Sequence, residues 1–178
     1  MKLTAPIVIT AGLLAGYADT KPPAVPAALE PGIGETLAMM VPARGVQIYE
    51  CRAGRDGKGG EWVFVAPEAE LFDARGNVIG RHGAGPSWEA NDGSRIAGSV
   101  KARAEAPTAG AVPWLLLAAK STGPNGAFSE VTSIQRVNTA GGVAPAAPCT
   151  PATVGTSARV GYTADYYFYT ARLPWRVL

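Results

Sequence analysis

The chain has a single histidine, His82, in a glycine-rich segment, residues 80–89 (GRHGAGPSWE). Glu89 ends this segment and Asp92 follows shortly after it. Because the unperturbed pKa of imidazole is near neutrality, a histidine beside a carboxylate can act as a general acid or base. His82, Glu89 and Asp92 are therefore the candidate catalytic residues, of a small hydrolase or isomerase-like enzyme. The competing interpretation is a wide turn with Trp88 in the core, because a lone histidine is more often structural.

Other signatures of catalysis or cofactor binding are weak. Ser87 does not lie in a Gly-x-Ser-x-Gly nucleophile elbow, and the nearby glycines lack the third glycine and the βαβ pattern of a dinucleotide site. Copper binding through His82 with Met39 or Met40 is the weakest hypothesis, since one histidine is a poor ligand set. We therefore expect neither a cofactor nor a metal.

Aromatic residues give a different hypothesis, because flat rings pack against the apolar faces of sugars and lipids. Residues 165–169 (DYYFY) place aromatic side chains on both faces of a predicted strand. Trp88, Tyr166 and Tyr167 are the candidate ligand-binding residues. Packing in the core is the alternative and the more frequent role of such residues. The full aromatic set comprises Trp62, Trp88, Trp114, Tyr166, Tyr167 and Tyr169.

The elements that would position these residues are short strands. Glycine and proline, 22 and 15 of the 178 residues, interrupt a series of short apolar runs. Residues 95–103 give the clearest half-buried strand, with Val100 and Ala102 on its buried side. Residues 114–119 (WLLLAA) are apolar throughout, which is typical of a strand buried on both faces. The predicted strands cover residues 46–52, 61–66, 71–72, 78–79, 95–103, 114–119, 128–137 and 159–170.

The expected fold is therefore all-β, an antiparallel sandwich or barrel of about eight short strands. Residues 73–77 (DARGN) are typical of a hairpin connection, because Gly76 and Asn77 can adopt positive φ. Residues 30–40 are predicted to form one short helix before the first strand, which would make the fold mainly β with one helix.

The first residues predict export. An uncharged stretch, 3–14, follows Lys2, and small residues precede position 19, so we interpret residues 1–18 as a signal peptide. Residues 13–16 (LLAG) resemble a bacterial lipobox, but Tyr17 stands where the lipid-bearing cysteine would be, which argues against a lipid anchor. The expected location is extracytoplasmic, periplasmic or secreted.

The rest of the chain is predicted to contain a linker, one domain and a short tail. Residues 19–31 are predicted to form a Pro/Ala-rich linker, 32–173 a single β domain and 174–178 a C-terminal tail. The mature part contains no apolar segment long enough for a transmembrane helix.

Cys51 and Cys149 are the two cysteines of the chain. In an exported protein such a pair is more often bridged than free, so we predict a disulfide between them. The alternative, a thiolate metal site, lacks ligands, because zinc needs about four and the chain has one histidine.

Charge argues against nucleic acid as a partner. The chain has 16 basic and 14 acidic residues, a formal net charge of +2, and no basic run. The expected partner is a small molecule, a glycan or a component of the cell envelope.

Five segments taken together resemble a family of exported bacterial and fungal proteins of unknown function. The resemblance extends over roughly residues 30–170 and implies an extracytoplasmic β domain, without an activity. Bacterial members often have tyrosine after the histidine, where this chain has Gly83. The segments are 45–52 (GVQIYECR), 85–94 (GPSWEANDGS), 112–128 (VPWLLLAAKSTGPNGAF), 131–142 (VTSIQRVNTAGG) and 162–169 (YTADYYFY).

The leading hypothesis is an exported, non-enzymatic binding or envelope-associated domain. It predicts a closed core with no cleft converging on His82. The alternative is the small enzyme that uses His82 with a nearby carboxylate.

Overall fold

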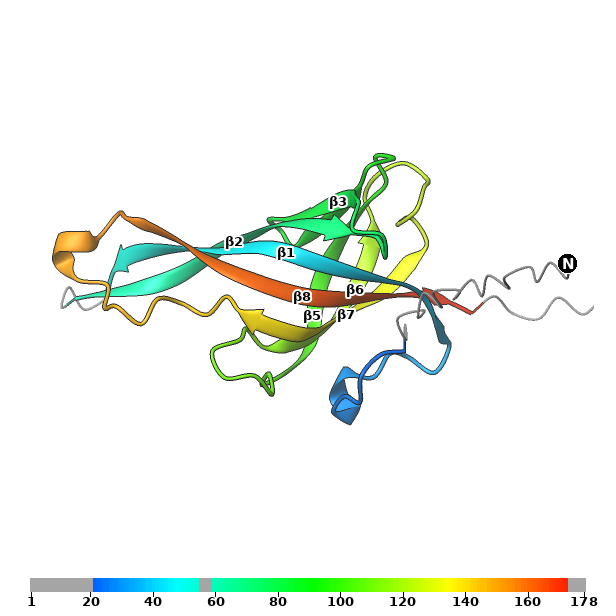
Figure 1. Cartoon of the computed structure of the whole chain (residues 1–178), viewed down its shortest axis with the longest axis horizontal. Helices are drawn as coiled ribbons and strands as arrows, with labels where there is room; N and C mark the ends of the chain where they lie inside the picture. The colour runs from blue at the N-terminus through cyan, green and yellow to red at the C-terminus, as the bar shows by residue number, and fades with distance from the viewer. Residues whose placement is uncertain (1–20, 55–58, 173–178) are drawn as a thin grey trace, which may run out of the picture.

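The computed structural model describes residues 21–54 and 59–172, where the chain forms one antiparallel sheet of eight strands. Each strand pairs with the next along the chain, and β8 pairs with β1, so that the sheet closes on itself (Figure 1). The predicted signal peptide, 1–18, and tail, 174–178, lie outside the described residues. The strands are β1 (Glu35–Ala53), β2 (Gly60–Phe72), β3 (Val78–Gly83), β4 (Ser87–Ala90), β5 (Arg95–Ala104), β6 (Trp114–Ser121), β7 (Val131–Gly141) and β8 (Ser157–Ala171).

The closed ring is irregular because three of its strands are much longer than the others. β1, β2 and β8 continue past the ring as a three-stranded arm, which points to the left in Figure 1. The predicted all-β antiparallel fold is confirmed, with the sheet closed rather than split into a sandwich. The predicted hairpin at 73–77 is also confirmed, and it joins β2 to β3.

The helix predicted at residues 30–40 is wrong, because residues 35–40 begin β1 and pair with β8. A bulge between Leu37 and Met39 shifts the alternation of side chains at this point. As a result Leu37 and Met40, three positions apart, pack on the same face of the sheet, whereas Met39 packs on the other. Apolar residues three positions apart on one face are also typical of a helix. Two 3₁₀ turns, η1 (Ala27–Leu29) and η2 (Pro151–Thr153), are the helical segments of the described residues, and neither is long enough to cross a membrane.

Hydrophobic side chains pack on both faces of the sheet. Side chains from all the strands pack in part of the interior of the ring, where Trp88 and Phe168 are in contact. A second cluster lies on the outer face over β6, β7 and β8. β8 supplies both, because its alternate residues point to opposite faces: Tyr166 and Phe168 inward, Tyr167 and Tyr169 outward.

The chain before β1 covers the outer cluster. Leu29 is fully buried there, and the amide Nε2 of Gln135 donates a hydrogen bond of 2.7 Å to its carbonyl. The Tyr169 hydroxyl donates in turn to Oε1 of Gln135 at 2.6 Å. The described part of the predicted linker therefore packs against the sheet instead of standing free of it.

The alternation predicted for residues 95–103 is interrupted. Ile96 is fully buried as expected, but a register shift between Val100 and Ala102 turns the second half of β5 over. Val100 is half exposed, and Ala102 packs against the outer cluster, so their predicted burial on one face is wrong. The prediction for residues 114–119 is confirmed at Trp114 to Leu117, which are buried on alternating faces.

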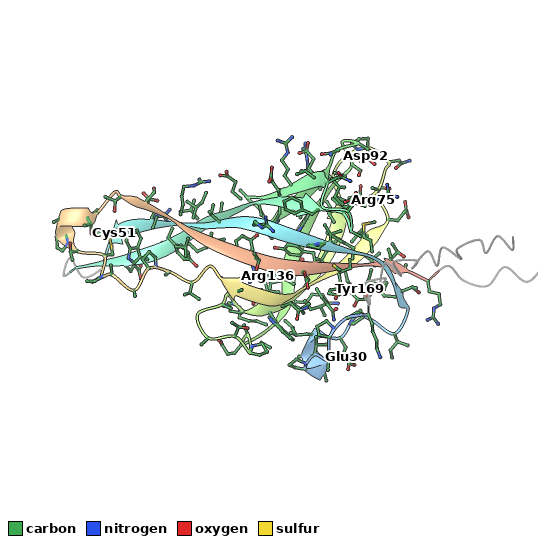
Figure 2. All side chains as sticks on the ribbon, viewed as in Figure 1. Glu30, Cys51, Arg75, Asp92, Arg136 and Tyr169 are labelled. Carbon is green, nitrogen blue, oxygen red and sulfur yellow. A yellow bond between two sulfur atoms is a disulfide. The ribbon has the colours of Figure 1, made fainter. Side chains whose placement is uncertain are left out.

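The predicted disulfide between Cys51 and Cys149 is confirmed, with an S–S distance of 2.02 Å. Cys51 lies on β1 in the arm, at the left in Figure 2, and Cys149 comes from the loop between β7 and β8. The indole Nε1 of Trp62 on β2 donates to the carbonyl of Ala147 in the same loop at 2.8 Å. The backbone of Cys51 also forms hydrogen bonds with Gly155 and Thr156, so the arm is fastened to this loop by a covalent bond and several hydrogen bonds.

Replacing both cysteines by alanine is expected to lower the free energy of unfolding by about 4 kcal/mol, because the bridge closes a loop of 98 positions and restricts the unfolded chain. Urea unfolding with and without a reductant measures the effect. The reductant should weaken the wild-type chain to the level of the variant and leave the variant unchanged. Equal stability of the variant and the oxidised wild type would contradict the prediction.

Candidate ligand-binding pocket

A cavity of about 500 Å³ lies inside the closed sheet, next to the point where the arm begins. Side chains from all eight strands line it, so the cavity depends on closure of the ring. Its described lining contains no acidic side chain. The lining residues are Gln47, Tyr49, Phe64, Val65, Pro67, His82, Gly85, Pro86, Trp88, Val100, Arg103, Val112, Pro113, Leu115, Leu117, Arg136 and Tyr166.

The pocket has an apolar rim and an apolar floor. Phe64, Val65 and Val100 are each about half exposed, which is unusual for large hydrophobic side chains, and all three line the cavity. Leu117 and Trp88 are buried at its inner end. A continuous apolar path therefore leads from solvent into the interior of the sheet.

His82 lies on β3 in an aromatic stack. Its ring lies 4.3 Å from the ring of Trp88, nearly parallel to it, and 5.2 Å from that of Tyr166. Its Nδ1 lies 2.8 Å from the carbonyl of Ser87, and a carbonyl only accepts, so Nδ1 carries the proton of the neutral ring. Burial, with a smaller contribution from the charge of Arg136, lowers the pKa of His82 to about 4 despite the opposing effect of the Ser87 hydrogen bond. His82 is therefore neutral at pH 7.

No hydrogen bond or ion pair between described residues joins His82 to Glu89 or Asp92, although His82 and Glu89 both line a second cavity. Glu89 is on the outer face of β4, in ion pairs with Arg95 at 2.9 Å and Arg81 at 3.4 Å. Asp92 lies in the turn after β4 and accepts hydrogen bonds from Ser94 and from the backbone of Ala127.

No carboxylate of the described residues is a hydrogen-bond partner of His82, so an acid–base pair has no geometric support there. The prediction that no cleft converges on His82 is nevertheless wrong, because His82 lines the cavity.

The candidate aromatic residues divide between the two faces of the sheet. Trp88 and Tyr166 line the cavity, whereas Tyr167 belongs to the outer cluster. Met39 and Met40, considered with His82 for copper, likewise pack on opposite faces of β1. Within the described segments, 21–54 and 59–172, no three His, Cys, Asp or Glu side chains form a group suited to a metal.

Several polar residues of the pocket were not among the predicted site residues, Arg136 and Gln47 among them. Arg136 on β7 points inward, and its Nε and Nη2 both donate to the carbonyl of Pro113, at 3.2 and 2.8 Å. Gln47 on β1 is almost fully buried, and its Nε2 has no hydrogen-bond partner in the part of the chain that the structure describes. The sequence did contain a signal for Arg136. It lies two positions after Ile134 in a strand, so its side chain points to the same inward face.

A pair of tyrosines on β8 lies beside these two residues. The hydroxyls of Tyr162 and Tyr166 are 3.5 Å apart, and burial raises the pKa of both well above its usual value. The side chain of Gln47 approaches the Tyr162 hydroxyl, and Arg136 approaches that of Tyr166. Gln47, Tyr162, Tyr166 and Arg136 therefore form one polar group, the polar wall, on an otherwise apolar interior.

The family described as "Protein of unknown function (DUF3455)" matches residues 31–170. The chain belongs to this family. The matched span includes every residue that lines the pocket and nearly all of the eight strands. Comparisons with curated proteins and with solved structures give no match. Because the family description assigns no activity, the inferences below depend on the pocket.

Acid is expected to destabilise the fold partly through His82. Its pKa is lower in the folded chain than in the unfolded one, so between pH 6.5 and about 4 the unfolded chain binds more protons. The free energy of unfolding should therefore fall by about 2–3 kcal/mol on this account as the pH drops from 7 to 4.5.

The matched variant is His82→Asn, whose amide can still donate to the Ser87 carbonyl. Urea unfolding at the two pH values should give a smaller loss for the variant by about this amount, while the titration of the carboxylates cancels in the comparison. An equal loss in both proteins would show that His82 is not buried in its neutral form.

Proposed function

We propose that this domain is an exported, non-enzymatic binding protein that holds one small, largely apolar molecule inside the closed sheet. The observation that carries the proposal is the cavity of about 500 Å³ lined by all eight strands. Ligand pockets are typically concave and mostly apolar, with a few placed polar groups, and have volumes of about 300–1,000 Å³. Closed sheets of about eight strands have an interior of the size that holds one small ligand.

The arrangement around His82 supports binding over catalysis. A ring with a pKa of about 4, stacked on Trp88, is not an imidazolium at neutral pH and so has no acidic proton to give to a substrate. A general acid or base works best with a pKa near the operating pH and a partner that orients it. The carboxylates nearest to His82 in sequence, Glu89 and Asp92, are engaged elsewhere.

Export is supported by two separate features. Residues 1–18 have the pattern of a signal peptide, and Tyr17 replaces the cysteine that a lipid anchor requires. The disulfide between Cys51 and Cys149 is compatible with an oxidising compartment, such as the periplasm or the outside of the cell. A small molecule of the envelope or of the medium is then the accessible ligand.

The neutral fluorophore N-phenyl-1-naphthylamine tests the pocket, because its emission rises when it leaves water. We expect saturable binding to the wild-type domain, and binding at least about tenfold weaker in Val100→Trp, whose indole would block the half-exposed rim. Val154→Trp is the matched control, since Val154 has similar exposure and does not line the cavity.

Two results would overturn the proposed pocket. One is the lack of saturable binding by the wild-type domain. The other is equal binding by Val100→Trp and the wild type, which would place the probe elsewhere on the molecule.

A further inference from the structure

We infer that the ligand carries a carboxylate, bound at the polar wall by Arg136 and Gln47, while its apolar body lies against Trp88 and the leucines of β6. This inference rests on the proposed function, because it names the class of molecule that the same pocket accepts. The inference requires that the polar wall provide a positive charge without a counter-ion and a hydrogen-bond donor without an acceptor. It also requires that the rest of the lining disfavour other classes of ligand.

Arg136 supplies the positive charge. Arg136 on β7 pairs with Leu115 on one neighbouring strand, β6, and with Tyr166 on the other, β8. Both of these residues line the cavity. Figure 2 labels Arg136 near the middle of the molecule. Its hydrogen-bond acceptor is the neutral carbonyl of Pro113. None of the ion pairs between described residues includes Arg136.

A guanidinium has five N–H donors arranged as a planar fork, and the Pro113 carbonyl engages only the Nε and Nη2 groups. The remaining donors of Arg136 can therefore bind a second acceptor. A carboxylate fits such a fork with two oxygens and also neutralises the charge. The neutralisation matters because a charge in a largely apolar interior is costly without a partner.

Gln47 supplies the independent second observation. Its side chain is 2 % exposed, and its Nε2 has no hydrogen-bond partner among the described residues. A buried donor without an acceptor costs about 1–3 kcal/mol, so such groups usually have a partner, which at a pocket is an ordered water or a ligand. Gln47 and Arg136 approach the two ends of the Tyr162–Tyr166 hydroxyl pair, which places their donors on one wall.

The rest of the lining selects against other ligands. A cation would meet Arg136 and Arg103 with no acidic side chain in the described lining to compensate it. Large apolar side chains, including Leu115, Leu117 and Trp88, leave the remainder of the ligand a mostly apolar environment. An aromatic or aliphatic monocarboxylate satisfies all three conditions.

The test compares naphthalene-1-carboxylate with naphthalene-1-carboxamide, which has nearly the same shape and no charge. Each compound displaces N-phenyl-1-naphthylamine from the domain at pH 7.5, and the measured quantity is the ratio of their two inhibition constants. We expect the wild type to prefer the carboxylate by at least about tenfold. Arg136→Met should reduce the ratio to near one, and Arg136→Lys, which keeps the charge without the fork, should give an intermediate value.

Arg75→Met is the matched control, since Arg75 is an exposed arginine in the hairpin between β2 and β3 and should leave the ratio unchanged. Because the ratio compares two competitors on the same protein, it does not depend on how tightly each variant binds the fluorophore. If Arg136→Met does not fold, Gln47→Glu gives a second test. Its carboxylate would occupy the polar wall and should abolish the preference.

The outcomes separate this inference from the proposed function. Equal displacement by the two compounds, or no displacement by either, overturns the carboxylate inference. If the fluorophore still binds in that case, the proposed pocket stands. A wild-type preference that persists in Arg136→Met or in Gln47→Glu also overturns it. If the fluorophore itself does not bind, the proposed function fails and this inference fails with it.

Discussion

Pairing between β1 and β8 is the constraint on which the rest of the structure depends. It closes the sheet, so that one face of every strand turns toward a single interior. Aromatic rings of β4 and β8 fill one part of that interior, with Trp88, Tyr166 and Phe168 in mutual contact. The part next to the arm is not filled in this way, and there the inward-facing residues of all eight strands surround the cavity. Closure of the sheet therefore produces both the fold and the pocket.

Much of the fold could be predicted because its signals are local. Alternation and turn residues located seven of the eight strands, with β2 predicted as two and β4 not predicted. The two cysteines predicted their bridge. The predictions were wrong where a bulge interrupts the alternation of side chains between the two faces of a strand. The shift after Leu37 made the start of β1 look helical, and the shift after Val100 turned Ala102 to the outer face of the sheet. A bulge depends on the neighbouring strand, which the local sequence does not contain.

The site was predictable only in part, for a related reason. His82 and Trp88 attracted attention by residue type, and the register places them opposite each other on β3 and β4. Glu89 follows Trp88 directly, so the alternation of a strand turns it to the outer face, away from His82. Arg136 and Gln47 were missed because a polar residue in an alternating strand is ordinarily assigned to the solvent side. Only closure of the sheet shows that their side chains point inward.

The two ends of the domain must find each other before the sheet can close. Contacts between the first and last strands have the largest sequence separation of the strand pairs in this sheet, and topologies rich in such contacts fold slowly. Until β8 is in place, β1 and β7 present unpaired backbone groups, to which another copy of the chain could add. A chain in which β8 is not yet in place therefore passes through a period in which dilution, or a chaperone that covers strand edges, decides between closure and aggregation. Synthesis alone cannot shorten that period, since the closing strand is the last one made.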